Sequence, residues 1–397
     1  RAVVQNTPRC PVEYSSTICY TIDQLTVPGT VSSNKTVVCQ NDNNNGVLTL
    51  TGQTGAVVRW EQNPGNQGWT SVGNGGNTTY NFAALVMRTC FRAVVQNGVC
   101  QPQLTNEVCV DVDAPSGGGN LTITTPNPIC KGGNGTIQLT GQFGNIVTIA
   151  RQDPVGGAWS DIAGTAGQTQ HLFNNLQNAV AFRVEVKNGV CPSAFSNTVT
   201  VNVVDSTIAG TLSQAHEICA DQNRQPLTLS GHLGAVLQWE SSTQCSPFVP
   251  QTTINNVTPT LPGGPLTQTT CFRALVRNAP CPQAYTQPVL VTVKPVTEGG
   301  QITAAGATTI CFGQPTGNLT LQNQVGDVLF WQRVPAPASN FQDTPGAIVQ
   351  IPNINPFHSE ASLTQSTCFR AYVRSGNACT ERFSDPICVT VMSEVAP

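Results

Sequence analysis

A twelve-residue stretch that recurs along the chain constrains the fold more than any other feature of the sequence. It reads Thr-Cys-Phe-Arg-Ala-Val-Val-Gln-Asn-Gly-Val-Cys at 89–100, and versions of it return at 181–191, 271–281 and 368–379, with a shortened one at 1–10. The arginines of the copies are residues 1, 92, 183, 273 and 370, so the intervals are 91, 91, 90 and 97 residues. A fixed period of this length indicates an array of equal structural units.

Each unit carries the pattern of a small β-sandwich. Residues 46–52 and 56–61 alternate apolar and polar side chains at strand period, and a glycine-containing turn separates them. The last hairpin is expected to pair 91–96 with 107–112, so that alternate side chains face the core while Arg92 faces outward. Helical periodicity is absent, and about 90 residues suit one immunoglobulin-like sandwich.

The predicted fold class is therefore all-β, with tandem immunoglobulin-like β-sandwich repeats forming an elongated rod. Residues 1–25 are expected to be the C-terminal hairpin of a truncated preceding repeat, because they match the end of the unit that follows. Full repeats, numbered 1 to 4 below, are expected at 26–113, 114–204, 205–295 and 296–397.

Composition excludes several classes of function. Charged residues make up only 10% of the chain and the formal net charge is −3, which gives no electrostatic reason to bind nucleic acid. No run of about 18 apolar residues is present, so no membrane insertion is expected. The 16 cysteines form no CxxC pair, which favours disulfides over zinc and indicates an oxidising, extracellular location.

The cysteine pattern predicts how most of the sulfurs pair. Repeat 2 has only Cys130 and Cys191, so this pair is forced if each repeat closes its own bridges. The matching bridges of the other repeats are Cys39–Cys100, Cys219–Cys281 and Cys311–Cys379. A strict immunoglobulin topology, however, places Cys39 far from the tip of the last hairpin of its own repeat. The alternative is that these cysteines join neighbouring repeats, as in Cys39–Cys191.

Other bridges are predicted inside the repeats. Repeat 2 lacks the matches of two hairpin cysteines together, which indicates that they bond to each other across the hairpin where they are present. Repeat 3 lacks one of the two and alone adds a cysteine after its tryptophan strand, which predicts an exchange of partner. The expected bridges are Cys90–Cys109, Cys368–Cys388 and Cys245–Cys271, with Cys10 and Cys19 paired upstream of the chain start.

No candidate catalytic residue, metal ligand or cofactor site stands out, so no enzyme is expected. Residues 41–46 (Asn-Asp-Asn-Asn-Asn-Gly) faintly resemble a calcium loop but lack its carboxylates, and we interpret them as a polar turn. The histidines are scattered and do not converge with carboxylates or thiols, so we interpret them as surface or loop residues: His171, His216, His232 and His358.

Two sets of repeated side chains are candidate binding groups. Trp60, Trp239 and Trp331 share one strand position, and strand alternation with Val58, Leu237 and Leu329 predicts that they face the core rather than stack on sugars. The repeated arginines are expected to cover apolar sheet surface with their stems and hold their heads in water, rather than form a ladder of ligands. They are Arg92, Arg183, Arg273 and Arg370.

The Cys-Phe-Arg-Ala-(Val/Leu/Tyr)-Val hairpins at 90, 271 and 368, with Cys-Pro-(Ser/Gln)-Ala-(Phe/Tyr) after two of the tips, resemble a known group of repeats. The chain is similar over essentially all of its length to the immunoglobulin-like repeats of giant cell-surface adhesins in Bacteroidota, notably the gliding-motility adhesins exported by the type IX secretion system. The resemblance implies export and O-glycosylation, with Ser206 in Asp205-Ser206-Thr207 as the candidate acceptor. The C-terminal secretion signal of that system is not in this chain.

Two functions follow from these observations. The first is a non-enzymatic, disulfide-stapled stalk segment of a cell-surface adhesin, acting in surface attachment or gliding motility. Its partners would be a surface polysaccharide or substratum, the neighbouring repeats, and outer-membrane or motility proteins. The alternative is a carbohydrate-binding array on a secreted polysaccharide-processing protein. Exposed, co-planar aromatic side chains would favour the array, and buried tryptophans the stalk.

Overall fold

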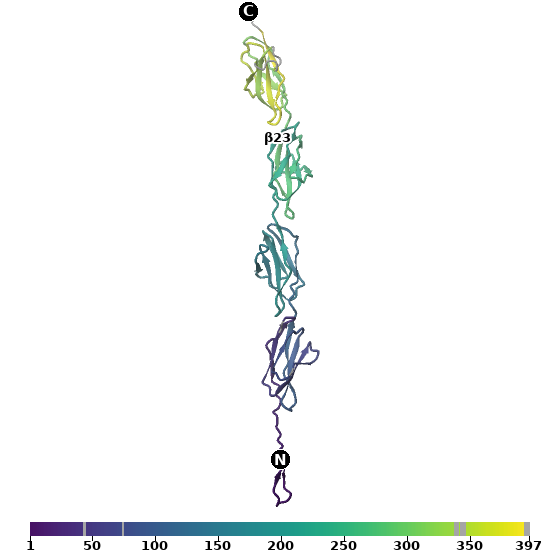
Figure 1. Ribbon diagram of the computed structural model, residues 1–397. Coiled ribbons are helices and arrows are strands. Elements are labelled where there is room, and N and C mark those ends of the chain that lie inside the picture. The colour runs from purple at the N-terminus through teal and green to yellow at the C-terminus, as the bar shows by residue number, and fades with distance from the viewer. Residues whose placement is uncertain (43–44, 74, 337–340, 342–346, 393–397) are drawn as a thin grey trace, which may run out of the picture. The chain divides into compact units, whose positions relative to one another are not determined.

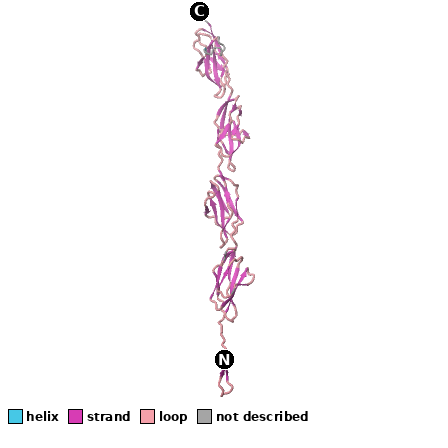
Figure 2. Ribbon diagram, in the orientation of Figure 1, coloured by secondary structure: helices cyan, strands magenta, loops and turns pink. Residues whose placement is uncertain are grey.

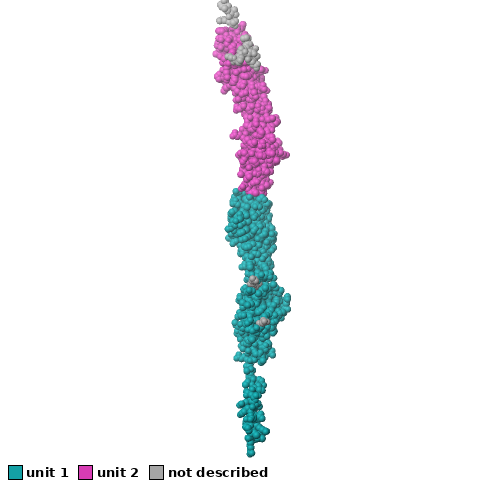
Figure 3. Space-filling model, in the orientation of Figure 1, with its two compact units in different colours: residues 1–203 teal, residues 204–397 magenta. Residues whose placement is uncertain are grey.

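The computed structural model describes residues 1–42, 45–73, 75–336, 341 and 347–392. Within these residues the chain forms β-strands and no α-helix, as the secondary-structure colouring makes plain (Figures 1 and 2). Two compact units divide the chain, Arg1–Val203 and Val204–Pro397 (Figure 3). The all-β prediction is confirmed. At the start of the first unit, β1 (Val3–Val4) pairs antiparallel with β2 (Glu13–Tyr14).

Repeat 1 is a sandwich of two sheets. One has the strand order β3-β5-β8, and the other has the order β4-β11-β9-β6-β7 with β10 paired to β9. The strands are β3 (Thr30–Ser33), β4 (Val37–Cys39), β5 (Gly46–Thr51), β6 (Ala56–Pro64), β7 (Thr70–Val72), β8 (Thr79–Phe82), β9 (Thr89–Gln96), β10 (Gln103–Leu104) and β11 (Val108–Asp113).

The other repeats return the same arrangement with small changes in the edge strands. Repeat 2 contains β12 (Asn120–Ile123), β13 (Ile129–Cys130), β14 (Gly133–Thr140), β15 (Asn145–Gln152), β16 (Trp159–Ile162), β17 (Gln170–Leu176), β18 (Val180–Lys187), β19 (Ala194–Phe195), β20 (Val199–Val201) and β21 (Val203–Val204). Repeat 3 contains β22 (Thr211–Leu212), β23 (His216–Cys219), β24 (Asn223–Arg224), β25 (Leu227–Ser230), β26 (Ala235–Ser242), β27 (Thr252–Ile254), β28 (Thr260–Leu261), β29 (Gly264–Pro265), β30 (Thr270–Arg277), β31 (Ala284–Tyr285) and β32 (Val289–Lys294). Repeat 4 contains β33 (Gln301–Ala304), β34 (Thr309–Cys311), β35 (Leu319–Gln322), β36 (Asp327–Pro335), β37 (Val349–Ile351), β38 (Phe357–His358), β39 (Thr367–Arg374), β40 (Arg382–Phe383) and β41 (Ile387–Met392).

One strand pair departs from the antiparallel rule in repeats 1, 3 and 4. In repeat 1 the short strand β4 leaves the first sheet and pairs parallel with the last strand β11. The same parallel pairing joins β23 to β32 and β34 to β41. Because parallel neighbours run in the same direction, the cysteine that ends the short strand lies at the end of the sandwich where the chain leaves for the next repeat.

Each repeat has its own hydrophobic core. Trp60, Trp239 and Trp331 are 1%, 0% and 0% exposed, so the prediction that they belong to the core is confirmed. Each indole N–H donates to a backbone carbonyl, which satisfies the one polar atom of a buried tryptophan. The position in repeat 2 holds the buried Ile149.

The alternation argument behind that prediction was wrong in one detail. A register shift interrupts the pairing of β6 with β9 between Val57 and Arg59, and the same shift recurs in the other three repeats. The extra residue of this bulge turns Val57 into the core and leaves Val58 40% exposed. The equivalent Leu237 of repeat 3 is 39% exposed. The tryptophan two residues on therefore faces the core although Val58 does not.

Trp60→Ala should destabilise repeat 1 by about 3–5 kcal/mol, because it empties a large buried site. Val58→Ala, on the exposed bulge of the same strand, should change stability by less than about 0.5 kcal/mol. Amide hydrogen exchange would record faster exchange in β5, β6 and β9 for Trp60→Ala only. Equal acceleration in repeats 3 and 4 would contradict separate cores.

Candidate functional site

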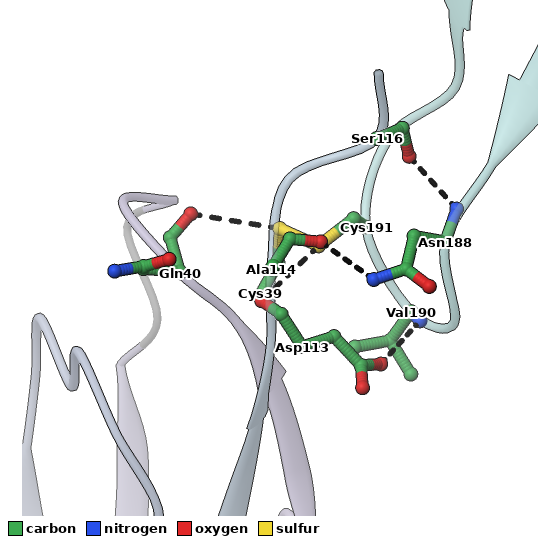
Figure 4. The surroundings of a disulfide bond; sticks show 8 residues. All are labelled: Cys39, Gln40, Asp113, Ala114, Ser116, Asn188, Val190 and Cys191. Atoms are coloured by element: carbon green, nitrogen blue, oxygen red, sulfur yellow. Dashed lines mark hydrogen bonds between the residues drawn. A yellow bond between two sulfur atoms is a disulfide. The ribbon is translucent and has the colours of Figure 1, made fainter. Parts of the chain in front are cut away.

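The joint between repeats 1 and 2 is built on the end of the parallel pair β4–β11. Cys39 lies opposite Asp113 in that pair, at the last residue of both strands. Its sulfur is bonded to Cys191, 152 residues further on, in the tip of the last hairpin of repeat 2 (Figure 4). Both cysteines are buried, at 6% and 0% exposure, so the bridge is shielded from solvent thiols.

Hydrogen bonds from the hairpin tip to the connecting segment surround this disulfide (Figure 4). The side-chain amide of Asn188 donates to the carbonyl of Ala114 at 2.8 Å, and its backbone N–H donates to Ser116 Oγ at 2.9 Å. The backbone N–H of Val190 donates to Asp113 Oδ2 at 3.0 Å. A charged acceptor makes the last of these bonds stronger than a neutral pair would. The tip is thus held by the last residue of repeat 1 and by the connection itself.

Gly189 at the tip is required by both conformation and space. Its φ is +48°, in the left-handed region that favours glycine. A Cβ added there would overlap the carboxylate of Asp113. Gly98 and Gly376 occupy the same place in repeats 1 and 4, also with positive φ and with a carboxylate, of Asp23 and Glu217, against the missing side chain.

The joint between repeats 3 and 4 has the same design with a different acid. Cys219, at the end of β23, is bonded to Cys379 in the last hairpin of repeat 4, with 4.9 Å between the Cα atoms. Position 294, opposite Cys219, is a lysine, and Glu217 on β23 supplies the carboxylate instead. Its Oε1 accepts from the backbone N–H groups of Asn377 and Ala378.

The prediction that these bridges close within each repeat is therefore wrong. The structure does not contain Cys39–Cys100, Cys130–Cys191, Cys219–Cys281 or Cys311–Cys379. Cys100 and Cys311 carry free thiols, whereas Cys130 and Cys281 are each disulfide-bonded. The physical reason is the parallel strand: it puts Cys39 at the opposite end of the sandwich from Cys100. The bridge between neighbouring repeats, weighed as the alternative, is the one observed.

The bridges predicted inside the hairpins are present. Two of them join residues that face each other directly across an antiparallel pair, and the third links the loop after β26 to β30 in repeat 3. They are Cys90–Cys109, Cys368–Cys388 and Cys245–Cys271. Cys10 and Cys19 are exposed thiols, and their pairing upstream of Arg1 stays a prediction.

The repeated arginines are not free to bind a ligand, and their heads do not sit in water as expected. Arg92 is 18% exposed, lies 2.8 Å from Glu61 and stacks on the ring of Trp69. Arg273 pairs with Glu240 at 2.7 Å and lies between the rings of Phe248 and Tyr285. Ion pairing and cation–π contact together cover the guanidinium groups.

Among the described residues no acid contacts the other two arginines, and both keep aromatic partners. Arg183 lies over the rings of Trp159 and Phe195, and the residue opposite it is Ala150, where repeats 1 and 3 have Glu61 and Glu240. Arg370 lies between the rings of Phe341 and Phe383 and donates to Gln332. The sequence signal that was missed is the acid or amide directly after each core tryptophan, namely Glu61, Glu240 and Gln332.

Glu61 is the acid whose titration this arrangement changes most clearly. Burial raises the pKa of Glu61, but the hydrogen bonds and charges of Arg92 and Arg59 lower it by more. The net pKa therefore lies below the ordinary value of 4.5. The ionised form is therefore the one that stabilises the folded repeat. Glu107, which also approaches Arg92, is more distant at 3.7 Å and 54% exposed.

The remaining candidates do not form a chemical site. His358 is buried, and its ring lies tilted against those of Trp331 and Phe369. Its Nε2 lies 3.2 Å from Glu360 Oε1, so the interpretation of His358 as a surface residue was wrong. In the part of the chain that is described, no three His, Cys, Asp or Glu side chains gather to hold a metal ion. Two of the asparagines in 41–46, at 43 and 44, lie outside that part.

The fold and the joints define a class: tandem immunoglobulin-like β-sandwich repeats stabilised by disulfides, the type found in extracellular or secreted proteins. The profile of a family described as "Domain of unknown function (DUF8696)" matches residues 27–114, 119–205, 208–295 and 300–393. The chain belongs to this family, as four tandem copies of its domain. No curated protein matches the chain. No helix in the described segments is long and apolar enough to cross a membrane.

Several solved structures of tandem domains are similar at low identity. Domains A168–A170 of titin are 12% identical, cover 68% of this chain and 99% of their own, and give a TM-score of 0.31. The four N-terminal immunoglobulin domains of Dscam1 isoform 6.44 are 9% identical over 94% and 100%, with a TM-score of 0.25. Chicken CNTN1 domains FN1–FN3 are 12% identical over 70% and 98%, with a TM-score of 0.25. Scores this low carry no argument about function.

Gly189→Ala should loosen the joint of repeats 1 and 2, because the new methyl group overlaps the Asp113 carboxylate. Local opening should become easier by about 1.4 kcal/mol, so dithiothreitol should reduce Cys39–Cys191 about tenfold faster. Gly141→Ala is the matched control, since φ there is +67° and the space for a Cβ is open. Equal rates of reduction of Cys39–Cys191 in the two variants would contradict the claim that the tip needs glycine at position 189.

Glu61→Gln should destabilise repeat 1 by about 1–3 kcal/mol at neutral pH, because a charge-assisted hydrogen bond is lost. Since the folded pKa is depressed, the contribution of Glu61 is present above 4.5 and is lost as the pH falls through the folded value. Denaturation curves of wild type and variant should therefore converge in acid. Glu107→Gln should change stability by less than about 1 kcal/mol at any pH. A stability difference between wild type and Glu61→Gln that stays the same at all pH values would contradict a stabilising role of the ionised Glu61.

Proposed function

We propose that this chain is a non-enzymatic, force-transmitting stalk segment of an extracellular adhesin. The observation that carries the proposal is the covalent joint, because Cys39–Cys191 and Cys219–Cys379 connect one repeat to the next independently of the backbone. A protein that only displayed separate binding modules would gain nothing from such joints. A protein under tension along its backbone would gain a great deal.

The gain comes from the path that tension follows. A bridge between residues 39 and 191 lets force pass from the end of β4 to the last hairpin of repeat 2 and removes the 152 residues between them from the stretched path. At 3.3–3.6 Å per extended residue, this hides about 500 Å of chain length. Cys219–Cys379 hides a similar length, with a separation of 160 residues. The strands inside each closed segment carry no load while the bridge lasts.

Burial of the aromatic side chains favours the stalk over a carbohydrate-binding array. The three tryptophans that a sugar would stack on are buried. The rings on the outer sheet face, such as Trp69 and Phe248, are engaged by arginine heads. Neither set offers the bare, co-planar faces that sugar rings need.

The resemblance of the hairpin motifs to Bacteroidota adhesin repeats supports the finer part of the proposal. We infer attachment to a cell surface, export by the type IX system, and a role in surface attachment or gliding motility. The partners would be a polysaccharide or substratum and outer-membrane or motility proteins. Ser206 is exposed, which is compatible with the O-glycosylation proposed there, and intact mass would reveal it.

Stretching single molecules by their termini tests the mechanical role. In the oxidised chain no extension step should exceed about 130 Å, the length of the longest segment outside the bridges, residues 1–39. With a reductant, each repeat of about 90 residues should unfold in a step of about 300 Å. A double Cys90→Ser, Cys109→Ser variant is the control, because that bridge lies inside a hidden segment and its loss should leave the oxidised trace unchanged. Steps of about 300 Å in the oxidised wild type would contradict the proposal.

A further inference from the structure

Two free thiols stand at positions that are bonded in other repeats. Cys100 is the tip cysteine of repeat 1 and matches Cys191 and Cys379, both of which close a joint. Cys311 ends the short strand of repeat 4 and matches Cys39 and Cys219, which supply the other half. Among the described residues, each half of the joint therefore occurs in a full repeat with its thiol free, the tip half at Cys100 and the strand half at Cys311.

The free tip of repeat 1 already has the geometry of the bonded tips. Cys100 Sγ lies 3.3 Å from the carbonyl of Gln24, as Cys191 Sγ does from Ala114. The side chain of Asn97 donates to that same Gln24 carbonyl at 2.8 Å. Val99 N–H donates to the Asp23 carboxylate at 3.1 Å. A tip therefore takes up its bonding conformation before any disulfide forms.

Cys311 is placed like the strand cysteines of the closed joints. β34 pairs parallel with β41, and Cys311 lies opposite Met392, in the register that sets Cys39 opposite Asp113. The difference is exposure: Cys311 is exposed, whereas Cys39 and Cys219 are 6% and 2% exposed under their tips. The end of β34 is thus half of an established interface without its cover.

We propose that Cys311 is a docking and bonding site for the last-hairpin tip of another repeat of this family. The tip would set its cysteine against Cys311 and cover the end of the β34–β41 pair, as the tips of repeats 2 and 4 cover theirs. Position 309 is a threonine and position 392 a methionine, so neither offers the acid found in the two closed joints. Shape, backbone hydrogen bonds and the disulfide carry this joint.

Bond formation needs a low-molecular-weight disulfide as the oxidant. The Cys311 thiolate attacks oxidised glutathione, which leaves a mixed disulfide and releases one glutathione thiolate. The tip thiolate then attacks the Cys311 sulfur of that mixed disulfide and releases the second glutathione. Two protein thiols are oxidised, one glutathione disulfide is reduced to two thiols, and the two protons end on glutathione.

The probe for the test is a synthetic hairpin of residues 89–110 with Cys90–Cys109 closed and Cys100 free, mixed with the full chain in a glutathione buffer. The equilibrium ratio of hairpin to glutathione bound at Cys311 is measured by mass spectrometry of peptides. Cys10 and Cys19, exposed thiols in the same molecule, are the internal reference. Two or three docking hydrogen bonds should raise the ratio at Cys311 at least about tenfold above theirs.

A linear peptide with Ser at positions 90 and 109 separates docking from simple thiol reactivity. It should bind Cys311 no better than Cys10 or Cys19. Equal ratios of the closed hairpin at all three thiols would overturn the proposal, and so would equal binding of the linear peptide and the closed hairpin at Cys311. Neither outcome depends on whether the chain bears force or what it adheres to.

Discussion

The parallel pairing of a short strand with the last strand of its own sandwich is the constraint on which the other features depend. In repeat 1 this pairing carries β4 to the end where β11 leaves the domain. Cys39 consequently faces the next repeat rather than its own hairpin tip, 61 positions later in the sequence at Cys100.

The joint combines three kinds of interaction that reinforce one another. The disulfide fixes the distance between strand end and tip, and it removes conformational freedom from the separated repeats. The carboxylate of Asp113 or Glu217 orients the tip through backbone N–H groups. Glycine at the tip leaves room for that carboxylate. Removing any one of them would weaken the other two, because all act on the same few residues.

Much of the fold follows from the sequence, because strand alternation and a fixed period are local signals. The hairpin bridge Cys90–Cys109 was accessible for the same reason: its two cysteines disappear together in repeat 2. The pairing of Cys39 was not accessible, since an array of equal repeats presents the same spacing whether each bridge closes within a unit or steps to the next. Only the position of β4 decides between these alternatives.

Other errors have equally physical causes. The bulge at Val58 changes the phase of a strand by one residue, and alternation cannot detect a shift that it assumes to be absent. Three aromatic partners of the arginines do recur at one strand position, at Phe195, Tyr285 and Phe383, but alternation predicts which face a side chain takes and not which neighbour it contacts. Asp113 was overlooked because an acid at the end of a repeat resembles an ordinary polar connection.

Peptide mapping of the protein under non-reducing conditions tests the central claim most directly. Proteolysis without reductant, followed by mass spectrometry, should yield fragments in which Cys39 is linked to Cys191 and Cys219 to Cys379. Fragments that link Cys39 to Cys100 and Cys130 to Cys191 would place the bridges inside the repeats and contradict the account.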